Sequence, residues 1–174
     1  MRILMAAALL LLAAGCRQPR HPHPELIVEE PSSLKPSIDV AAPADAEQLL
    51  EGFYEPDPGG WRWAAPEFTI SLGVPDELRG KQARIEADLW IPDSGWTHLS
   101  GLTIAARTAD QELGRWRAPG PGARTAVFPV PAALTREEAI LVDFVLDRFI
   151  PPGGEETRKL GVVPLKFRLA AAAP

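Results

Sequence analysis

The sequence has little of what marks several large classes of protein. One cysteine among 174 residues cannot form an intramolecular disulfide or build a cysteine-rich zinc site. With 18 Lys and Arg against 23 Asp and Glu, the net charge is -5, which argues against a nucleic-acid-binding surface. The sequence has three histidines and contains no nucleophile elbow, glycine-rich phosphate loop or HExxH motif. We therefore expect a protein that is not an enzyme, with no cofactor, no metal and no nucleic-acid partner.

Long apolar runs are also missing, apart from one near the N-terminus. The run from Ile3 to Ala14 is shorter than the roughly 20 residues that span a bilayer, and it fits the core of a signal peptide covering residues 1–15. It ends in Ala13-Ala14-Gly15-Cys16, where small residues precede the single cysteine. This ending resembles the lipobox of bacterial lipoproteins, with Ala13 where that family prefers Leu. An ordinary secretory signal with a chance cysteine is the alternative.

The lipobox resemblance implies a membrane anchor. In that family the signal is removed, the cysteine is diacylated and the new amino terminus is often acylated, as by palmitate. Two or more acyl chains hold a protein stably on a bilayer without spanning it. Arg17 follows Cys16 where Asp would favour the inner membrane, so the resemblance implies the outer membrane, facing the periplasm.

Proline is abundant where cysteine is scarce, and it divides the chain in two. Six of the 19 prolines fall within residues 16–45, a stretch without aromatic residues or sustained periodicity. Such a segment predicts a disordered, proline-rich tether. His21 and His23 lie within it, but a metal site needs three or four ligands, so we interpret them as solvated linker residues.

Residues 46–170 show the alternation of apolar and polar side chains that is typical of strands with one buried face. Proline- and glycine-rich turns separate these runs, so we predict an all-β, antiparallel β-sandwich of jelly-roll type. A short helical turn is expected within residues 132–138. Pro164 interrupts the last strand, which indicates an edge strand or a bulge. The expected strands cover residues 67–72, 83–91, 102–106, 126–130, 140–146 and 161–169.

Five short segments resemble the small jelly-roll modules attached to, or encoded near, bacterial cell-surface glycosyltransferases. They are Gly52-Phe53-Tyr54, Trp61-Arg62-Trp63, residues 129–134, Phe149-Ile150-Pro151 and residues 156–162. Glu156 stands where those modules have Asp. The resemblance implies a non-catalytic domain that handles sugars, and a glycan or a protein of a glycosyltransferase system as partner.

Sugar rings stack on aromatic faces, while carboxylates and guanidinium groups bind their hydroxyls. On this basis the candidate ligand-binding residues are Trp61, Arg62, Trp63, Glu86, Asp88, Trp90, Trp96 and Trp116. On a strand, Trp61 and Trp63 would share one face and Arg62 the other. The alternative, which we favour, is that one or both tryptophans fill the core and Arg62 pairs with a carboxylate.

The other candidates also have two interpretations. Trp90 falls on the polar face of its strand, in line with Glu86 and Asp88, where it is either exposed for recognition or covered by a loop. We favour a covering loop, because monomers rarely expose large apolar patches without purpose. Trp96 is expected on an exposed loop rim.

Trp116 lies between Arg115 and Arg117, which would occupy the opposite face of its segment. These arginines would either bind an acidic glycan or form surface ion pairs, which contribute little stability. Arg158 is expected to form a structural pair with Glu156 at the final strand.

Two functions follow from these observations. The first is a lipid-anchored, glycan-binding module of the bacterial cell envelope. The second is a structural or protein-interaction lipoprotein without a sugar ligand, which docks a partner through an edge strand or its polar face.

Overall fold

The computed structural model describes residues 34–109 and 111–172. The predicted signal peptide, Cys16, His21 and His23 lie outside the described residues. No helix in the described part of the chain is long and apolar enough to cross a membrane.

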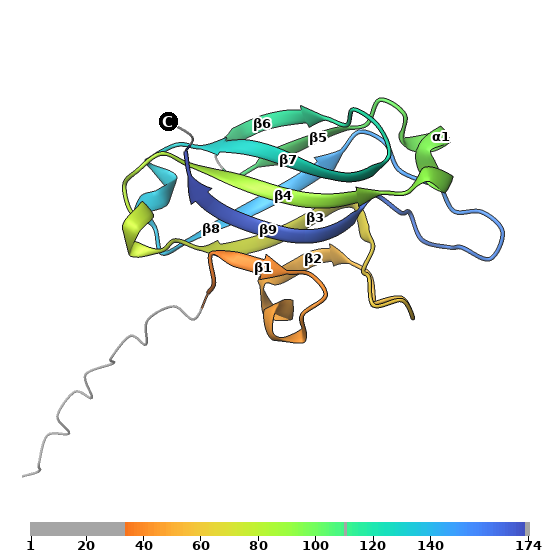
Figure 1. Ribbon diagram of the computed structural model, residues 1–174, viewed down its shortest axis with the longest axis horizontal. Coiled ribbons are helices and arrows are strands. Elements are labelled where there is room, and N and C mark those ends of the chain that lie inside the picture. Colours follow the sequence, from red (N-terminus) through yellow and green to blue (C-terminus); the bar gives the residue numbers. More distant parts are fainter. Residues whose placement is uncertain (1–33, 110, 173–174) are drawn as a thin grey trace, which may run out of the picture. The chain divides into compact units, whose positions relative to one another are not determined.

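Two antiparallel sheets form the described structure (Figure 1). This confirms the all-β sandwich expected from the alternation. The four-stranded sheet has the order β1-β9-β4-β7, and the five-stranded sheet has the order β2-β3-β8-β5-β6. The strands are β1 (Ser37–Asp39), β2 (Leu49–Phe53), β3 (Ala64–Gly73), β4 (Ala83–Ile91), β5 (Thr103–Arg107), β6 (Glu112–Arg117), β7 (Gly122–Val130), β8 (Ala139–Leu146) and β9 (Val163–Ala171).

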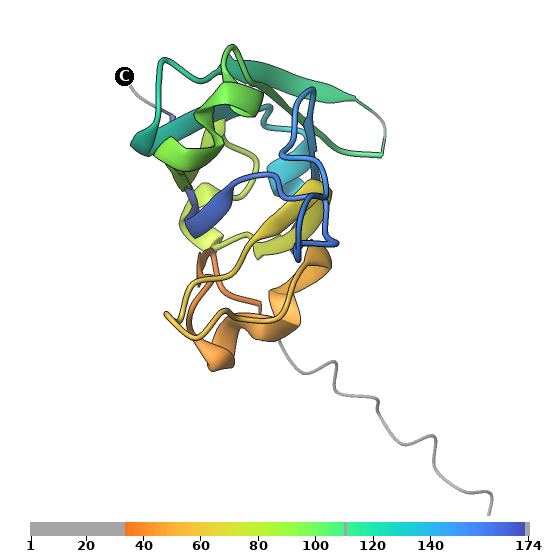
Figure 2. The same cartoon turned by 90° about the vertical axis from the view of Figure 1, so that its right-hand side faces the viewer.

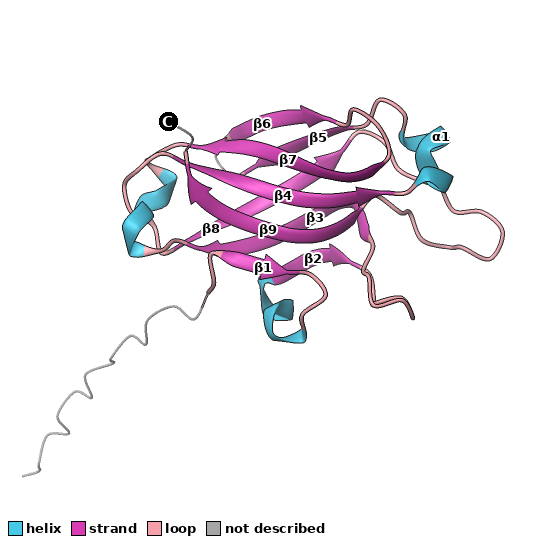
Figure 3. Cartoon of the chain, in the orientation of Figure 1, coloured by secondary structure: helices cyan, strands magenta, loops and turns pink. Residues whose placement is uncertain are grey.

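Short helical turns occupy the connections between strands (Figure 3). The helical turn expected within residues 132–138 is present as η4. Figure 2 looks onto the end of the sandwich where α1 and the long loop between β8 and β9 lie. The helical segments are η1 (Pro43–Gln48), η2 (Asp76–Leu78), η3 (Asp93–Gly95), α1 (Trp96–Leu99) and η4 (Leu134–Arg136).

The core lies between the sheets and is filled by the side chains that the alternation predicted. Along β4, the residues at every second position from Ala83 to Ile91 are buried, and β8 buries its residues in the same way. At the centre, Phe68 of β3 stacks on Phe144 of β8 with ring centroids 5.0 Å apart. Phe128 and Phe167, from the opposite sheet, pack against Phe144 at 5.6 and 5.4 Å. One aromatic cluster therefore joins the two sheets.

The sandwich begins before residue 46, the start expected from the sequence. Residues 37–39 form β1 and pair with β9, although they fall in the segment predicted as tether. Ile38 is fully buried in the core. Asp45, in η1, accepts hydrogen bonds from the Lys35 ammonium and from the Asp39 amide, which lower the pKa of this carboxyl. Prolines precede and follow this short strand, and their abundance led the composition to predict a disordered tether here.

Strand β9 contains a β-bulge at Leu165. Its neighbour β4 pairs Asp88 with Lys166 and Leu89 with Pro164, so Leu165 has no partner residue on β4. Proline has no N–H to donate to the ladder, which favours a bulge beside Pro164. Of the two alternatives raised by this proline, the bulge is therefore correct.

The bulge reverses the alternation along β9. Regular alternation would put residues 161, 163, 165, 167 and 169 on one face. Phe167 and Leu169 do face the core, but Leu165 is 41% exposed on the outer face of the sheet. Because the bulge adds a residue, Leu165 and Lys166 both point outwards. This irregularity shapes the pocket described next.

Candidate ligand-binding pocket

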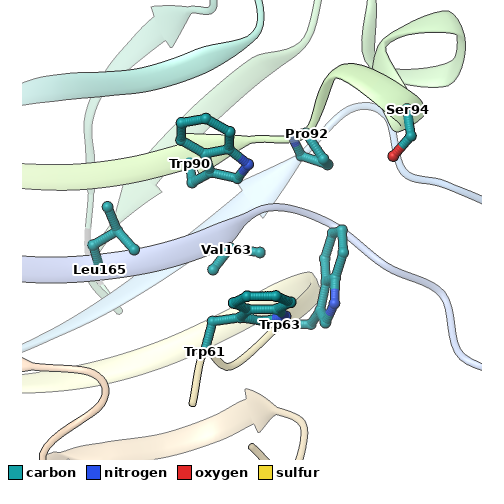
Figure 4. A pocket seen from close by; sticks show the side chains of 7 residues that line it. All are labelled: Trp61, Trp63, Trp90, Pro92, Ser94, Val163 and Leu165. Carbon is teal, nitrogen blue, oxygen red and sulfur yellow. The ribbon is translucent and has the colours of Figure 1, made fainter. Parts of the chain in front are cut away.

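Three tryptophans surround an open pocket on the outer side of the four-stranded sheet (Figure 4). Its volume is about 510 Å³, within the range of ligand sites in proteins. Trp90 of β4 lies on one side of β9, and Trp61 and Trp63 lie on the other, with Val163 and Leu165 between them. Pro92 and Ser94, which follow β4, complete the lining. Among the described residues that line the pocket, Ser94 is the only one with a non-aromatic polar side chain.

The loop between β2 and β3 carries Trp61 and Trp63, and hydrogen bonds fix its shape. The Asp57 amide donates to the Trp61 carbonyl at 2.8 Å, and the Tyr54 amide donates to the Trp63 carbonyl at 3.0 Å. The Trp61 indole N–H donates to the Asp57 carboxylate at 3.2 Å. A Cβ atom on Gly59 would lie 2.5 Å from the Trp61 ring, so the ring packs where only glycine leaves room. The orientation of Trp61 is therefore set by its own loop.

Arg158 ties this loop to the one between β8 and β9. Its guanidinium donates to both oxygens of Glu156, at 2.9 and 2.8 Å, and lies 3.5 Å from Asp57. It also sits over the Tyr54 ring, 5.2 Å from the centroid. Hydrogen bonds from the Arg158 side chain and amide lower the pKa of Glu156 to about 2. The predicted structural pair is confirmed, but it lies in the loop before the final strand.

Trp61 and Trp63 do not fill the core, contrary to the interpretation that the sequence favoured. Trp61 is 51% exposed, and Trp63 is half-buried at the pocket wall. Residues 61–63 precede β3, which begins at Ala64, so strand alternation does not apply to them. The Ala64 amide donates to the Val162 carbonyl at 2.9 Å, which brings the loop alongside the start of β9.

Trp90 lies on the outer face of β4, as the alternation predicted, and is 42% exposed. The loop expected to cover it is not found among the described residues; Trp90 opens into the pocket instead. The face of the strand was therefore predicted correctly, but the covering loop over the Trp90 indole was not.

Glu86 and Asp88 share that face but do not line the tryptophan pocket. Glu86 accepts hydrogen bonds from Arg84 at 2.8 Å and Arg168 at 2.7 Å, and the Arg84 hydrogen bond is the main cause of its lowered pKa. Asp88 accepts a hydrogen bond from the Thr125 hydroxyl at 2.6 Å and lies 3.9 Å from Arg168. Both carboxylates thus link neighbouring strands.

Arg62 faces a separate hollow beside the pocket, which also contains Trp61 and Lys166. Its Nε is buried and has no hydrogen-bond partner within the described residues. The expected pairing of Arg62 with a carboxylate is not found in residues 34–109 or 111–172.

Trp96 and Trp116 do not belong to the pocket. Trp96 lies in α1 rather than on a loop rim, and both indoles pack against the core. Arg115 and Arg117 point outwards from β6, opposite Trp116, as expected. Arg115 forms an ion pair with Glu112 at 2.9 Å, which is the surface-pair interpretation of this segment.

A second concavity, of about 560 Å³, lies on the outer side of the five-stranded sheet. Its polar lining includes Glu51, Glu67 and Arg107, together with Asp143, which accepts a hydrogen bond from the Thr69 hydroxyl at 2.7 Å. The phenylalanines at its base belong to the core, so it has no exposed aromatic ring. Across the described ranges, no group of three or more His, Cys, Asp or Glu could hold a metal ion.

Val163 and Leu165 line the tryptophan pocket, although neither was a candidate from the sequence. Strict alternation assigned both residues to the core. Pro164 between them was the available signal, because a proline within a strand marks a break in the ladder.

The comparisons with known proteins show no family. No family model matches the sequence, and no curated protein matches it. A solved structure described as "CBM4 structure and function" shares 13% sequence identity, covers 84% of this chain and 94% of its own, and gives a TM-score of 0.31. This is a loose likeness between folds.

Proposed function

We propose that this domain is a non-catalytic binding module that holds a glycan in the tryptophan pocket. The observation that carries the proposal is that Trp61 and Trp90, 51% and 42% exposed, flank the same pocket. A large apolar patch on a protein surface marks an interaction site more often than chance exposure. Trp61 is also held in place by Asp57 and Gly59, so its ring is presented in a fixed orientation.

The chemistry of the lining supports a sugar. The faces of a pyranose ring present C–H groups, which pack on indole rings, while its hydroxyls need a few hydrogen-bonding groups at the edge. The indole N–H groups of Trp63 and Trp90 and the Ser94 hydroxyl can supply these hydrogen bonds. The pocket combines large aromatic rings with few polar groups, as is typical of small-molecule sites.

The same proposal places the module in the bacterial cell envelope. Its support is the sequence alone: the apolar run Ile3 to Ala14 and the small residues before Cys16. Lipid on Cys16 would hold the protein at a membrane, with the outer membrane facing the periplasm as the proposed site. The domain would then bind glycans close to the envelope surface.

Titration calorimetry with envelope polysaccharide fragments tests the proposal. We expect Trp61→Ala and Trp90→Ala each to weaken binding about thirtyfold or more, because truncating a central tryptophan costs about 2 kcal/mol or more. Leu141→Ala is the matched control, since Leu141 is 57% exposed on the other sheet and outside the pocket. Its affinity should equal that of the wild type.

Two outcomes would count against glycan binding. One is the absence of heat and of chemical-shift changes with every fragment. The other is binding that Trp61→Ala and Trp90→Ala leave unchanged. If crosslinking at the tryptophan pocket captured a protein while no sugar bound, the alternative of a protein-interaction lipoprotein would replace the proposal.

A further inference from the structure

We infer that the ligand of the tryptophan pocket is an acidic sugar, whose carboxylate or phosphate group lies at Lys166. The inference rests on the proposed function, because it specifies the class of glycan for the same pocket. It comes from the side chains next to the tryptophans rather than from the tryptophans themselves.

The bulge in β9 joins the pocket to two smaller hollows. Leu165 lines the tryptophan pocket and both hollows, and Lys166, which follows it on the same face, lines the two hollows. One hollow, of about 410 Å³, contains Arg62, and the other, of about 340 Å³, contains Arg124. A ligand stacked on the tryptophans would therefore extend over Leu165 toward these cationic groups.

These three cations differ from most others on the domain. Lys166, Arg62 and Arg124 form no ion pair with any described carboxylate, whereas Arg84 and Arg168 on the same sheet are paired. The Nε groups of Arg62 and Arg124 are also buried without a hydrogen-bond partner. Unsatisfied donors of this kind are costly, and an anionic ligand nearby would lower that cost.

Three carboxylates lie close to these cations, and each accepts a hydrogen bond from another group. Asp39 accepts a hydrogen bond from the Ala41 amide at 3.0 Å, and Asp88 accepts one from Thr125. Asp45, whose pKa Lys166 helps to lower, is paired with Lys35. Each hollow nevertheless holds two cations against one carboxylate, Asp39 in one and Asp88 in the other, so its local charge favours an anion on the ligand even though the whole chain is acidic.

Matched acidic and neutral probes test the inference with the full-length protein. The first pair is trigalacturonate and its methyl ester, and the second is mannose 6-phosphate and mannose. We expect the acidic member of at least one pair to bind roughly tenfold more tightly, a difference that shrinks as salt screens the charges. The two pairs distinguish a carboxylate from a phosphate.

Substitutions then assign the effect to residues. Lys166→Gln and the double variant Arg62→Gln with Arg124→Gln should reduce binding of the acidic probe to that of the neutral one, without changing binding of the neutral probe. Arg117→Gln is the control, because Arg117 is exposed, has no described ion pair and lies on β6, outside the three cavities. Thermal unfolding verifies that each variant is folded.

The outcomes separate the two proposals. Equal affinity for acidic and neutral probes, lost in Trp90→Ala, would overturn the inference and leave glycan binding intact. Acidic preference that survives Lys166→Gln and the double arginine variant would also overturn it. If neither member of either pair bound, and envelope polysaccharide fragments did not bind, the proposed function itself would fail.

Discussion

At the scale of single residues, Asp57 connects the shape of the pocket to an ionic network. Its carboxylate accepts the Trp61 indole N–H and lies 3.5 Å from Arg158, which in turn binds Glu156. The exposed tryptophan is therefore positioned by charged groups that never enter the pocket. A change in the charge of Glu156 should reach Trp61 through Arg158 and Asp57.

This network predicts a specific effect of pH on stability. Glu156 has a pKa lowered from 4.5 to about 2, so its charged form is favoured in the folded protein. A lowered carboxyl pKa stabilises the fold above the unfolded value and loses that contribution as pH falls through the folded value. We expect Glu156→Gln to lower the melting temperature at neutral pH and at pH 5. Between pH 4.5 and about 2, the difference from the wild type should shrink toward zero.

Thermal unfolding followed by circular dichroism from pH 7 to about 2 measures this difference, with tryptophan fluorescence as a readout of Trp61. Glu155→Gln is the control, because Glu155 is exposed and its carboxyl forms no described ion pair. A melting-temperature difference between Glu156→Gln and the wild type that stays constant over this range would contradict the prediction.

At the scale of the elements, periodicity predicted the strands that alternate regularly. β4 was expected at residues 83–91 and has those bounds, because each inward residue is apolar and turns flank the strand. The short strands β1, β2 and β6 were not expected, since each buries at most one residue and so shows little alternation of apolar and polar side chains. In β9 regular alternation predicts that Leu165 faces the core, but the bulge turns its side chain to the outer face.

The candidate site was predicted in part for the same physical reason. A regular strand places Trp90 on an outer face, which the sequence shows. Trp61 and Trp63 lie in a loop, whose course depends on contacts with residues about 100 positions away, such as the hydrogen bond from Ala64 to Val162. No local pattern encodes such contacts, so the meeting of these tryptophans with Trp90 could not be predicted from periodicity.

The start of the sandwich at β1 leads to a prediction about truncation. Ile38 and Val40 are buried in the core, and burying such a side chain contributes about 1.5–3 kcal/mol each. A chain that begins at residue 46 should therefore melt several degrees below one that begins at residue 34, or fail to fold. Thermal unfolding of the two chains tests this, and equal melting temperatures would show that β1 is dispensable.

At the scale of the whole molecule, binding and anchoring are expected to be separable. The tryptophan pocket is built entirely from residues 61–165, whereas the proposed anchor is Cys16. Substituting Cys16 should shift the protein from the membrane to the soluble fraction without altering the pocket. Substituting Trp61 or Trp90 should weaken binding without altering the location of the protein.

The anchor can be tested by its own substitution. With lipid on Cys16, the wild type should be recovered in the membrane fraction and should incorporate labelled palmitate, because two or more acyl chains hold a protein stably on a bilayer. Cys16→Ser should appear in the soluble fraction without label, and its melting temperature should match that of the wild type. Trp90→Ala, with Cys16 intact, is the control and should stay with the membrane. If Cys16→Ser fractionated like the wild type, the protein would be held at the membrane by something other than lipid on this residue.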